Sequence, residues 1–444
     1  SEPEASIKDG AQINMSGAAG ADAAVRVRAA DNTFMVQAGG TVTGAGAAAV
    51  SGTVNTGIVA KKTTARIGDA DVKASDVEVA AESSEKIFTL TANVSIAGAA
   101  GVGAGVGVNV IANETSAGIG AGANIDATDD ISVEASQNTL LNLNTVAVAG
   151  GIAGVGGAFS VGVIANKTKA YVEGSDNLTD RTTLNAGGTT AISAVSEENL
   201  VTATVSGAGG VAGVTGAFGV KVVKSDTDAY IGKNSIVTAD EVEVDATDTI
   251  RVVGVGGAAT GGLVGVGGTV DATIVLNTTS AHIDSGAEID AVHDVKVAAL
   301  SDKLVNSTTF AGSGGAVGVA GAVSIVSVGS LLDGEAKSGL NGDATGSLVD
   351  TRIKEDKVST QLGNSEHVQG VKTDVANRTS SQGVAADLKG TTPPPLKNTM
   401  AFIGSGAQVK AGDNVAVTAA DKTLAVVSAG AGAVGAFAGV AGTV

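Results

Sequence analysis

The chain has 444 residues, of which 65 are glycine and 2% are aromatic, and it contains no cysteine and no tryptophan. This composition excludes disulfide bonds, cysteine-ligated zinc and a cysteine nucleophile. The formal net charge of −18 argues against a nucleic-acid partner, because nucleic acids need a basic surface. With so few aromatic residues, the core must consist of small and β-branched side chains.

The chain opens on the acidic segment Ser1-Glu2-Pro3-Glu4, which lacks the positive and apolar regions of a secretory leader. It stops at Val444, part-way through a recurring unit. We therefore expect both ends to be cuts in a longer protein.

A motif close to N-x-T-x-A-x-I-G recurs along the chain, with spacings of 52, 53, 59, 52 and 120 residues between its alanines. Because asparagine tolerates the left-handed conformation and hydrogen-bonds its own backbone, we expect the motif asparagines to lie at corners between strands. The clearest copies begin at Asn113, Asn166, Asn277 and Asn398, and the aligned alanines are Ala65, Ala117, Ala170, Ala229, Ala281 and Ala401.

Two further markers keep the same order in each unit. A V-x-V-x-A segment follows the first marker, as at Val77/Val79 and Val242/Val244, and a run of Gly, Ala and Val precedes it. Three markers in fixed order establish an internal repeat.

Within the Gly/Ala/Val runs, large apolar residues alternate with small or polar ones. This period of two is typical of a strand with one buried face. We expect the apolar set to face the interior and the intervening Ser160, Gly162, Gly219 and Lys221 to face water. The predicted inward residues are Phe159, Val161, Val163, Phe218, Val220 and Val222.

These patterns predict an all-β fold, a parallel β-helix (β-solenoid). A unit of this length suits two coils of about 25 residues each, with glycine at the sharp corners. At the spacing of neighbouring strands, about fourteen such coils would stack over roughly 70 Å. Known solenoids suggest a right-handed helix.

Segments 161–172 and 401–419 resemble the Ala/Gly/Val-rich repeats of giant adhesins and leukotoxins of fusobacteria and related anaerobes, which are similar in architecture to filamentous haemagglutinins. The resemblance covers nearly the whole chain. It implies export through an outer-membrane transporter, a location on the bacterial surface or outside the cell, and attachment to host-cell or bacterial receptors or glycans. It also implies toxicity to host cells in some members, and it supplies no catalytic residues.

The longest spacing contains a polar insertion at 332–397, between shaft segments 1–331 and 398–444. Its segment Leu348–Leu362 could form an amphipathic helix. The three prolines Pro393–Pro395 could form a stiff segment that leads the chain back to the stack. The insertion could be a solvated decoration of the shaft, or it could be a protrusion that binds a partner.

Other chemical signals are weak. The acidic clusters Asp126–Asp130 and Asp245–Asp248 could hold Ca²⁺, but the calcium-binding nonapeptide is absent, so we expect solvated turns and no cofactor. The three histidines, His282, His293 and His367, lack the spacing of a metal site. No repeat position concentrates carboxylates, so we do not expect an enzyme.

The sequence therefore predicts a structural and adhesive shaft of a giant surface or secreted protein, able to stack end to end into filaments. One alternative is a cytotoxin, because the uncharged run Thr145–Ala165 is long enough to cross a membrane. Its period-two pattern instead favours a buried strand. The other alternative is a polysaccharide-acting enzyme.

Overall fold

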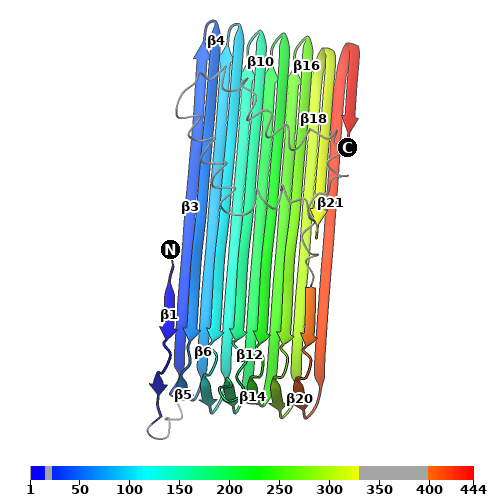
Figure 1. Ribbon diagram of the computed structural model, residues 1–444. Coiled ribbons are helices and arrows are strands. Elements are labelled where there is room, and N and C mark those ends of the chain that lie inside the picture. Colours follow the sequence, from blue (N-terminus) through cyan, green and yellow to red (C-terminus); the bar gives the residue numbers. More distant parts are fainter. Residues whose placement is uncertain (1, 16–22, 330–398) are drawn as a thin grey trace. The chain divides into compact units, whose positions relative to one another are not determined.

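A computed structural model describes residues 2–15, 23–329 and 399–444 (Figure 1). In these residues the strands pair in parallel and no helix is present, which confirms the predicted all-β class. The chain divides into one compact unit of residues 1–273, 277–326 and 398–444 and a second of 274–276 and 327–397. Asn398 and the predicted insertion, including its helix, lie outside the described residues.

Most of the chain is in long strands that come in consecutive pairs, and a short strand separates one pair from the next. The long strands are β3 (Val25–Ala45), β4 (Ala48–Ile67), β6 (Val77–Ala97), β7 (Ala100–Ile119), β9 (Ile131–Gly150), β10 (Ala153–Val172), β12 (Thr189–Gly209), β13 (Ala212–Ile231), β15 (Glu241–Gly261), β16 (Val264–Ile283), β18 (Val295–Val328) and β21 (Val415–Thr443). The short strands are β1 (Glu4–Ile7), β2 (Gln12–Ile13), β5 (Asp71–Ala74), β8 (Asn124–Ala127), β11 (Thr183–Ala186), β14 (Ile236–Ala239), β17 (Glu288–Ala291), β19 (Thr399–Ile403) and β20 (Gln408–Ala411).

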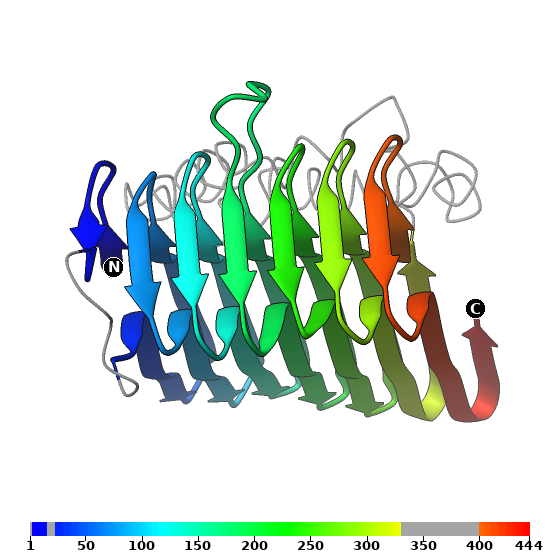
Figure 2. The same cartoon turned by 90° about the horizontal axis from the view of Figure 1, so that it is seen from below.

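The long strands form a 14-stranded sheet in the order β1-β4-β7-β10-β13-β16-β18-β15-β12-β9-β6-β3, with β19 on β16 and β21 on β18. This sheet is nearly closed and barrel-like, so that two layers of long strands face each other (Figure 2). Thr215 on β13, for example, donates a hydrogen bond across the interior to Ser206 on β12 at 2.6 Å. The other short strands form a separate 7-stranded sheet, β2-β5-β8-β11-β14-β17-β20.

Strands that pair with each other come from successive repeats of the sequence. Ala65 on β4 pairs with Ala117 on β7, Ala117 pairs with Ala170 on β10, and Ala170 pairs with Ala229 on β13. The expectation of two coils per unit was therefore wrong, because one unit supplies two long strands and one short strand before the chain returns to its neighbour. At about 4.8 Å per strand, the seven short strands span only about 30 Å, not 70 Å.

An apolar core lies beside the short strands, where the marker alanines and the V-x-V-x-A segments meet. Ala117, Ile119, Ile125, Ile131 and Val133 are all 0% exposed and belong to one continuous cluster. The same cluster extends from Val27 to Val297 and packs against Val409 on β20. Burial of these side chains, at about 1.5–3 kcal/mol for each Val or Ile, stabilises the stack.

The predicted facing of the Gly/Ala/Val runs was inverted. Ser160 on β10 hydrogen-bonds Thr204 on the facing β12, so it points into the interior. Since side chains alternate along a strand, Phe159 and Val161 point outward, and the Phe159 ring stacks on Phe218 of the next strand at 5.3 Å. Val163, Val220 and Val222 share this outer face, although Val163 and Val222 are buried there.

Glycine has two roles in this arrangement. The predicted corner role holds at Gly210 (φ 147°), which connects β12 to β13 and stacks on the equivalent Gly151 (φ 157°). Other glycines are inward-facing and let the two layers approach. A Cβ atom on Gly154 would lie 2.7 Å from the carbonyl oxygen of Gly209, for example.

Substitution of Gly210 by Ala should therefore destabilise the protein by about 1–3 kcal/mol, through its left-handed φ and a clash with the Gly151 carbonyl. The neighbouring Gly209→Ala is the matched control, because a Cβ there meets no atom within 4 Å. Urea unfolding midpoints would measure the difference, and equal midpoints for the two variants would refute the assigned role of the turn glycine.

Candidate functional site

A polar belt runs through the interior between the facing layers, next to the apolar core. On one layer Lys61, Asn113, Asn166 and Ser225 pair in consecutive positions across β4, β7, β10 and β13, and Asn277 on β16 continues the belt. The facing layer contributes Asp31, Ser83, Glu85, Gln137, Thr139, Ser196, Glu198, Asp248, Ser301 and Lys303. Buried polar groups are costly unless hydrogen-bonded, so the two halves must match.

Three of the motif asparagines, Asn113, Asn166 and Asn277, belong to this belt, so their predicted corner role was wrong. Asn166 lies in the middle of β10, 3% exposed, and its amide donates to Thr139 Oγ1 at 3.0 Å and to Glu198 Oε1 at 3.2 Å. Asn277 likewise donates to Asp248 at 3.1 Å and Ser301 at 2.8 Å, and Asn113 is buried at the equivalent position of β7. Left-handed asparagines do occur at turns, but they are Asn14 and Asn234.

Two buried carboxyl groups meet at the centre of the belt. The hydroxyl of Ser225 lies 3.1 Å from both Glu198 Oε1 and Asp248 Oδ1. Burial raises the pKa of Asp248 to about 6, and burial together with the charge of Asp248 raises the pKa of Glu198 well above its usual range. The pair therefore holds a proton near neutral pH. Asp248, expected in a solvated turn, instead lies within β15 and faces inward.

Three lysines are also buried in the interior, each against a carboxylate. Lys61 contacts Asp31 and Glu85, Lys221 contacts Asp271, and Lys303 lies 2.5 Å from Asp421. Lys221, predicted to face water, is fully buried, and its loss of hydration lowers its pKa. These ion pairs were not expected from the sequence, because Lys221 had been placed on the outside and no facing had been assigned to Lys61 or Lys303.

Substrates cannot reach these carboxyl groups. A glycoside-cleaving pair needs a groove that places a sugar between the two carboxyl groups. Glu198 and Asp248 are instead 0% exposed. Among the described residues, no group of three or more His, Asp or Glu side chains is placed to hold a metal ion.

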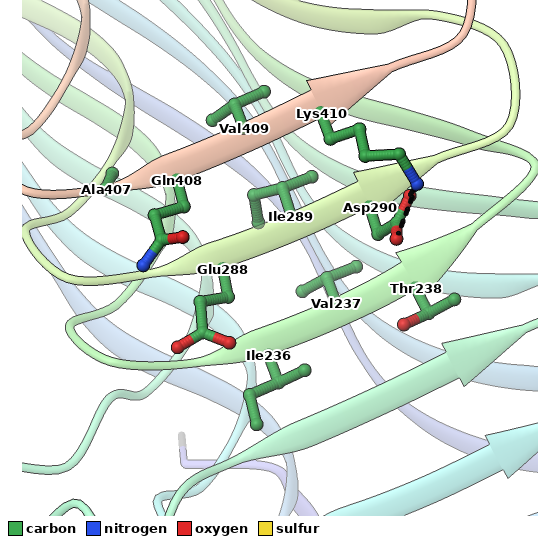
Figure 3. A pocket seen from close by; sticks show the side chains of 10 residues that line it. All are labelled: Ile236, Val237, Thr238, Glu288, Ile289, Asp290, Ala407, Gln408, Val409 and Lys410. Carbon is green, nitrogen blue, oxygen red and sulfur yellow. Dashed lines mark hydrogen bonds and ion pairs between the residues drawn. The ribbon is translucent and has the colours of Figure 1, made fainter.

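The outer face of the short-strand sheet is open and polar (Figure 3). Ile236, Glu288 and Gln408 align across β14, β17 and β20, beside the row of Thr238, Asp290 and Lys410. Lys410 points to Asp290 in Figure 3 and lies 2.9 Å from it, whereas Val237, Ile289 and Val409 point to the core. Asp126, for which a solvated turn was expected, instead lies on β8 on the same face, 3.6 Å from Lys73.

An aromatic ladder follows the marker alanines on the outside of the long strands. Tyr171, Tyr230, His282 and Phe402 stack in sequence, with ring separations of 5.7, 5.1 and 4.7 Å. The ammonium group of Lys169 lies 4.6 Å and 4.7 Å from the two tyrosine ring centres. Successive units therefore place like groups at the spacing of neighbouring strands, which produces a repetitive outer surface.

Comparison with known proteins gave no match: no protein-family model, no curated protein and no solved structure is similar to the chain.

The Glu198–Asp248 pair should make stability depend on pH. Because the folded-state pKa values are raised above the unfolded values of about 4, the folded protein binds more protons in the interval above pH 4. The stabilisation that comes from these bound protons is complete below pH 4. It is lost as pH rises through the folded pKa of Asp248, about 6, and through the raised pKa of Glu198.

The variant Glu198→Gln places an amide N–H donor beside Asp248 and removes one titrating carboxyl group. Between pH 4 and pH 8, we expect the free energy of unfolding of this variant to fall less than that of the wild type, because one carboxyl group with a raised pKa has been removed. Urea unfolding at several pH values measures this difference. Glu197→Gln, on the opposite side of the same strand, is the control. Parallel pH profiles for wild type and Glu198→Gln would contradict a shared proton.

Proposed function

We propose that this chain is part of a β-solenoid shaft with an adhesive role, exposed on a bacterial surface or secreted from the cell. The observation that carries the proposal is the in-register pairing of like residues one unit apart, as in Val161 with Val220 and Tyr171 with Tyr230. Such stacking lets each added unit bury its own core against the previous one.

In this solenoid one circuit consists of a long strand, a returning long strand and a short strand. The repeat of 52 or 53 residues then corresponds to one circuit, as the pairing of Ala48 with Ala100 and of Ala100 with Ala153 supports. The closed interior leaves the outer faces as the surfaces on which partners can bind.

The repetitive outer surface favours adhesion. The aromatic ladder presents the same kind of group in successive circuits, so a polymeric partner such as a surface glycan could bind several circuits at once. Multiple weak contacts of this kind raise the overall affinity without any single tight site. Host-cell and bacterial receptors are the proposed partners.

End-to-end stacking is part of the proposal. Strand β21 pairs with β18, and its side chains, including Val426 and Val434, are exposed. An uncovered parallel edge of this length is a template for further pairing. We therefore expect electron microscopy at high protein concentration to show filaments. Compact single particles at every concentration would count against stacking.

Adhesion is tested with beads that carry the purified chain. We expect them to bind epithelial or bacterial cells more than beads that carry the urea-unfolded chain, because the ordered ladders exist only in the folded state. Tyr230→Ser with Phe402→Ser should weaken binding several-fold, whereas Lys86→Ser, on the outer face of β6, should not. Equal binding by folded and unfolded chain would contradict the proposal.

A membrane-active protein is the second candidate, because apolar residues occupy the exposed turns between the long strands. Ile152, Val211 and Leu263 follow the turn glycines in three successive circuits and are 58%, 48% and 59% exposed. Exposed apolar patches mark surfaces that contact other proteins or membranes. In the described part of the chain, no helix is long and apolar enough to cross a bilayer.

Dye release from lipid vesicles separates the two candidates. A shaft should leave vesicles intact at concentrations that saturate cell binding. Leakage that disappears in the triple variant Ile152→Ser, Val211→Ser and Leu263→Ser would favour the membrane-active function instead.

A further inference from the structure

One buried lysine has the surroundings of a reactive amine. Lys61 on β4 contacts Asp31 on the facing strand β3 through its ammonium group, and it lies 3.0 Å from Glu85 Oε1 on β6. The three side chains are 3%, 9% and 0% exposed. An amine, a carboxyl group and a second carboxyl group therefore meet where water is largely excluded.

Carboxyl oxygens of two different residues, Asp31 and Glu85, contact Lys61 Nζ, and either can take a proton from the ammonium group. Reactants held in contact by the fold can reach effective concentrations of about 10⁵–10⁸ M.

We propose that Lys61 and Asp31 condense to form an amide cross-link between the two facing layers. Lys61 Nζ first gives up one proton and then attacks Asp31 Cγ, so that a C–N bond forms in a tetrahedral intermediate. Nζ gives up a second proton, the bond from Cγ to one Asp31 oxygen breaks, and that oxygen departs with the two protons as water. The overall change is amine plus carboxylic acid to amide plus one water, with no oxidant or reductant.

Glu85 is placed to move the protons. Its Oε1 accepts hydrogen bonds from Ser83 at 2.5 Å and Lys61 at 3.0 Å, and its Oε2 accepts one from Thr139 at 3.1 Å. A carboxyl group in this position can take a proton from the attacking nitrogen and return it to the departing oxygen. Glu85 contacts the reacting amine directly, so we assign it as the catalytic residue.

The other buried lysines lack one part of this arrangement. Lys221 contacts Asp271, whose second oxygen accepts from the Ser307 hydroxyl, and no second carboxyl group comparable to Glu85 contacts it in the described part of the chain. Lys303 lies against Asp421, which is 43% exposed and so in contact with water. Both should stay ion pairs, and they serve as internal comparisons.

Intact-mass spectrometry of the denatured, purified full chain tests the proposal. We expect a mass lower than the sequence mass by one water, and a protease digest should give a branched peptide that joins Lys61 to Asp31. Lys61→Met and Glu85→Gln should have their full sequence masses, whereas Lys221→Met should still lose one water. Asp31→Asn should lose ammonia in place of water, because the same amide would form.

Three outcomes would overturn the proposal. The first is a wild-type mass equal to the sequence mass, and the second is a loss of water that persists in Lys61→Met. The third, a complete cross-link in Glu85→Gln, would remove the role of Glu85. Circular dichroism of Glu85→Gln checks that its strands form. If they do not, Asp31→Asn decides, because a full sequence mass for this variant rejects the cross-link and a loss of ammonia supports it.

Discussion

The close approach of the two layers of long strands constrains everything inside them. A Cβ atom on Gly162 would lie 3.0 Å from Leu200 on the facing layer, so there is no room for large side chains from both sides. Polar groups that point inward therefore depend on the opposite layer for hydrogen-bond partners, as Asn166 does on Thr139 and Glu198. An unmatched polar group would cost about 1–3 kcal/mol.

This constraint gives the polar belt a role in register. Strands built from Gly, Ala and Val can slide by two residues and still present the same kind of side chain to each neighbour. A slide of two residues would, however, move Asn166 away from Asn113 and bring Thr168 into its place. The belt thus penalises the shifted pairings that the low-complexity segments would otherwise tolerate, and buried polar groups are known to specify register in this way.

Part of this architecture could be predicted from the sequence. The repeat markers and the alternation located the strands, because both are local patterns. The facing of the strands was inverted because large apolar residues were assumed to point inward, and a narrow interior reverses that preference at Phe159 and Val161. Counting back in twos from the buried Ala170 would have placed Asn166, Gly162 and Ser160 inside. The ion pairs could not be predicted, since Lys221 had been placed outside and all of the pairs join residues that lie far apart in the sequence.

The geometry of one circuit also changes what kind of shaft is proposed. In the proposed solenoid each circuit would advance the stack by about 4.8 Å, while a long strand of 20 residues extends about 65 Å across it. A solenoid of this kind therefore gains little length for each unit and instead adds a broad strip of surface. A shaft that extends far from its point of attachment would require many units. Broad, repetitive faces are available with few units, so multivalent attachment along the sides fits this circuit better than a role as a thin spacer.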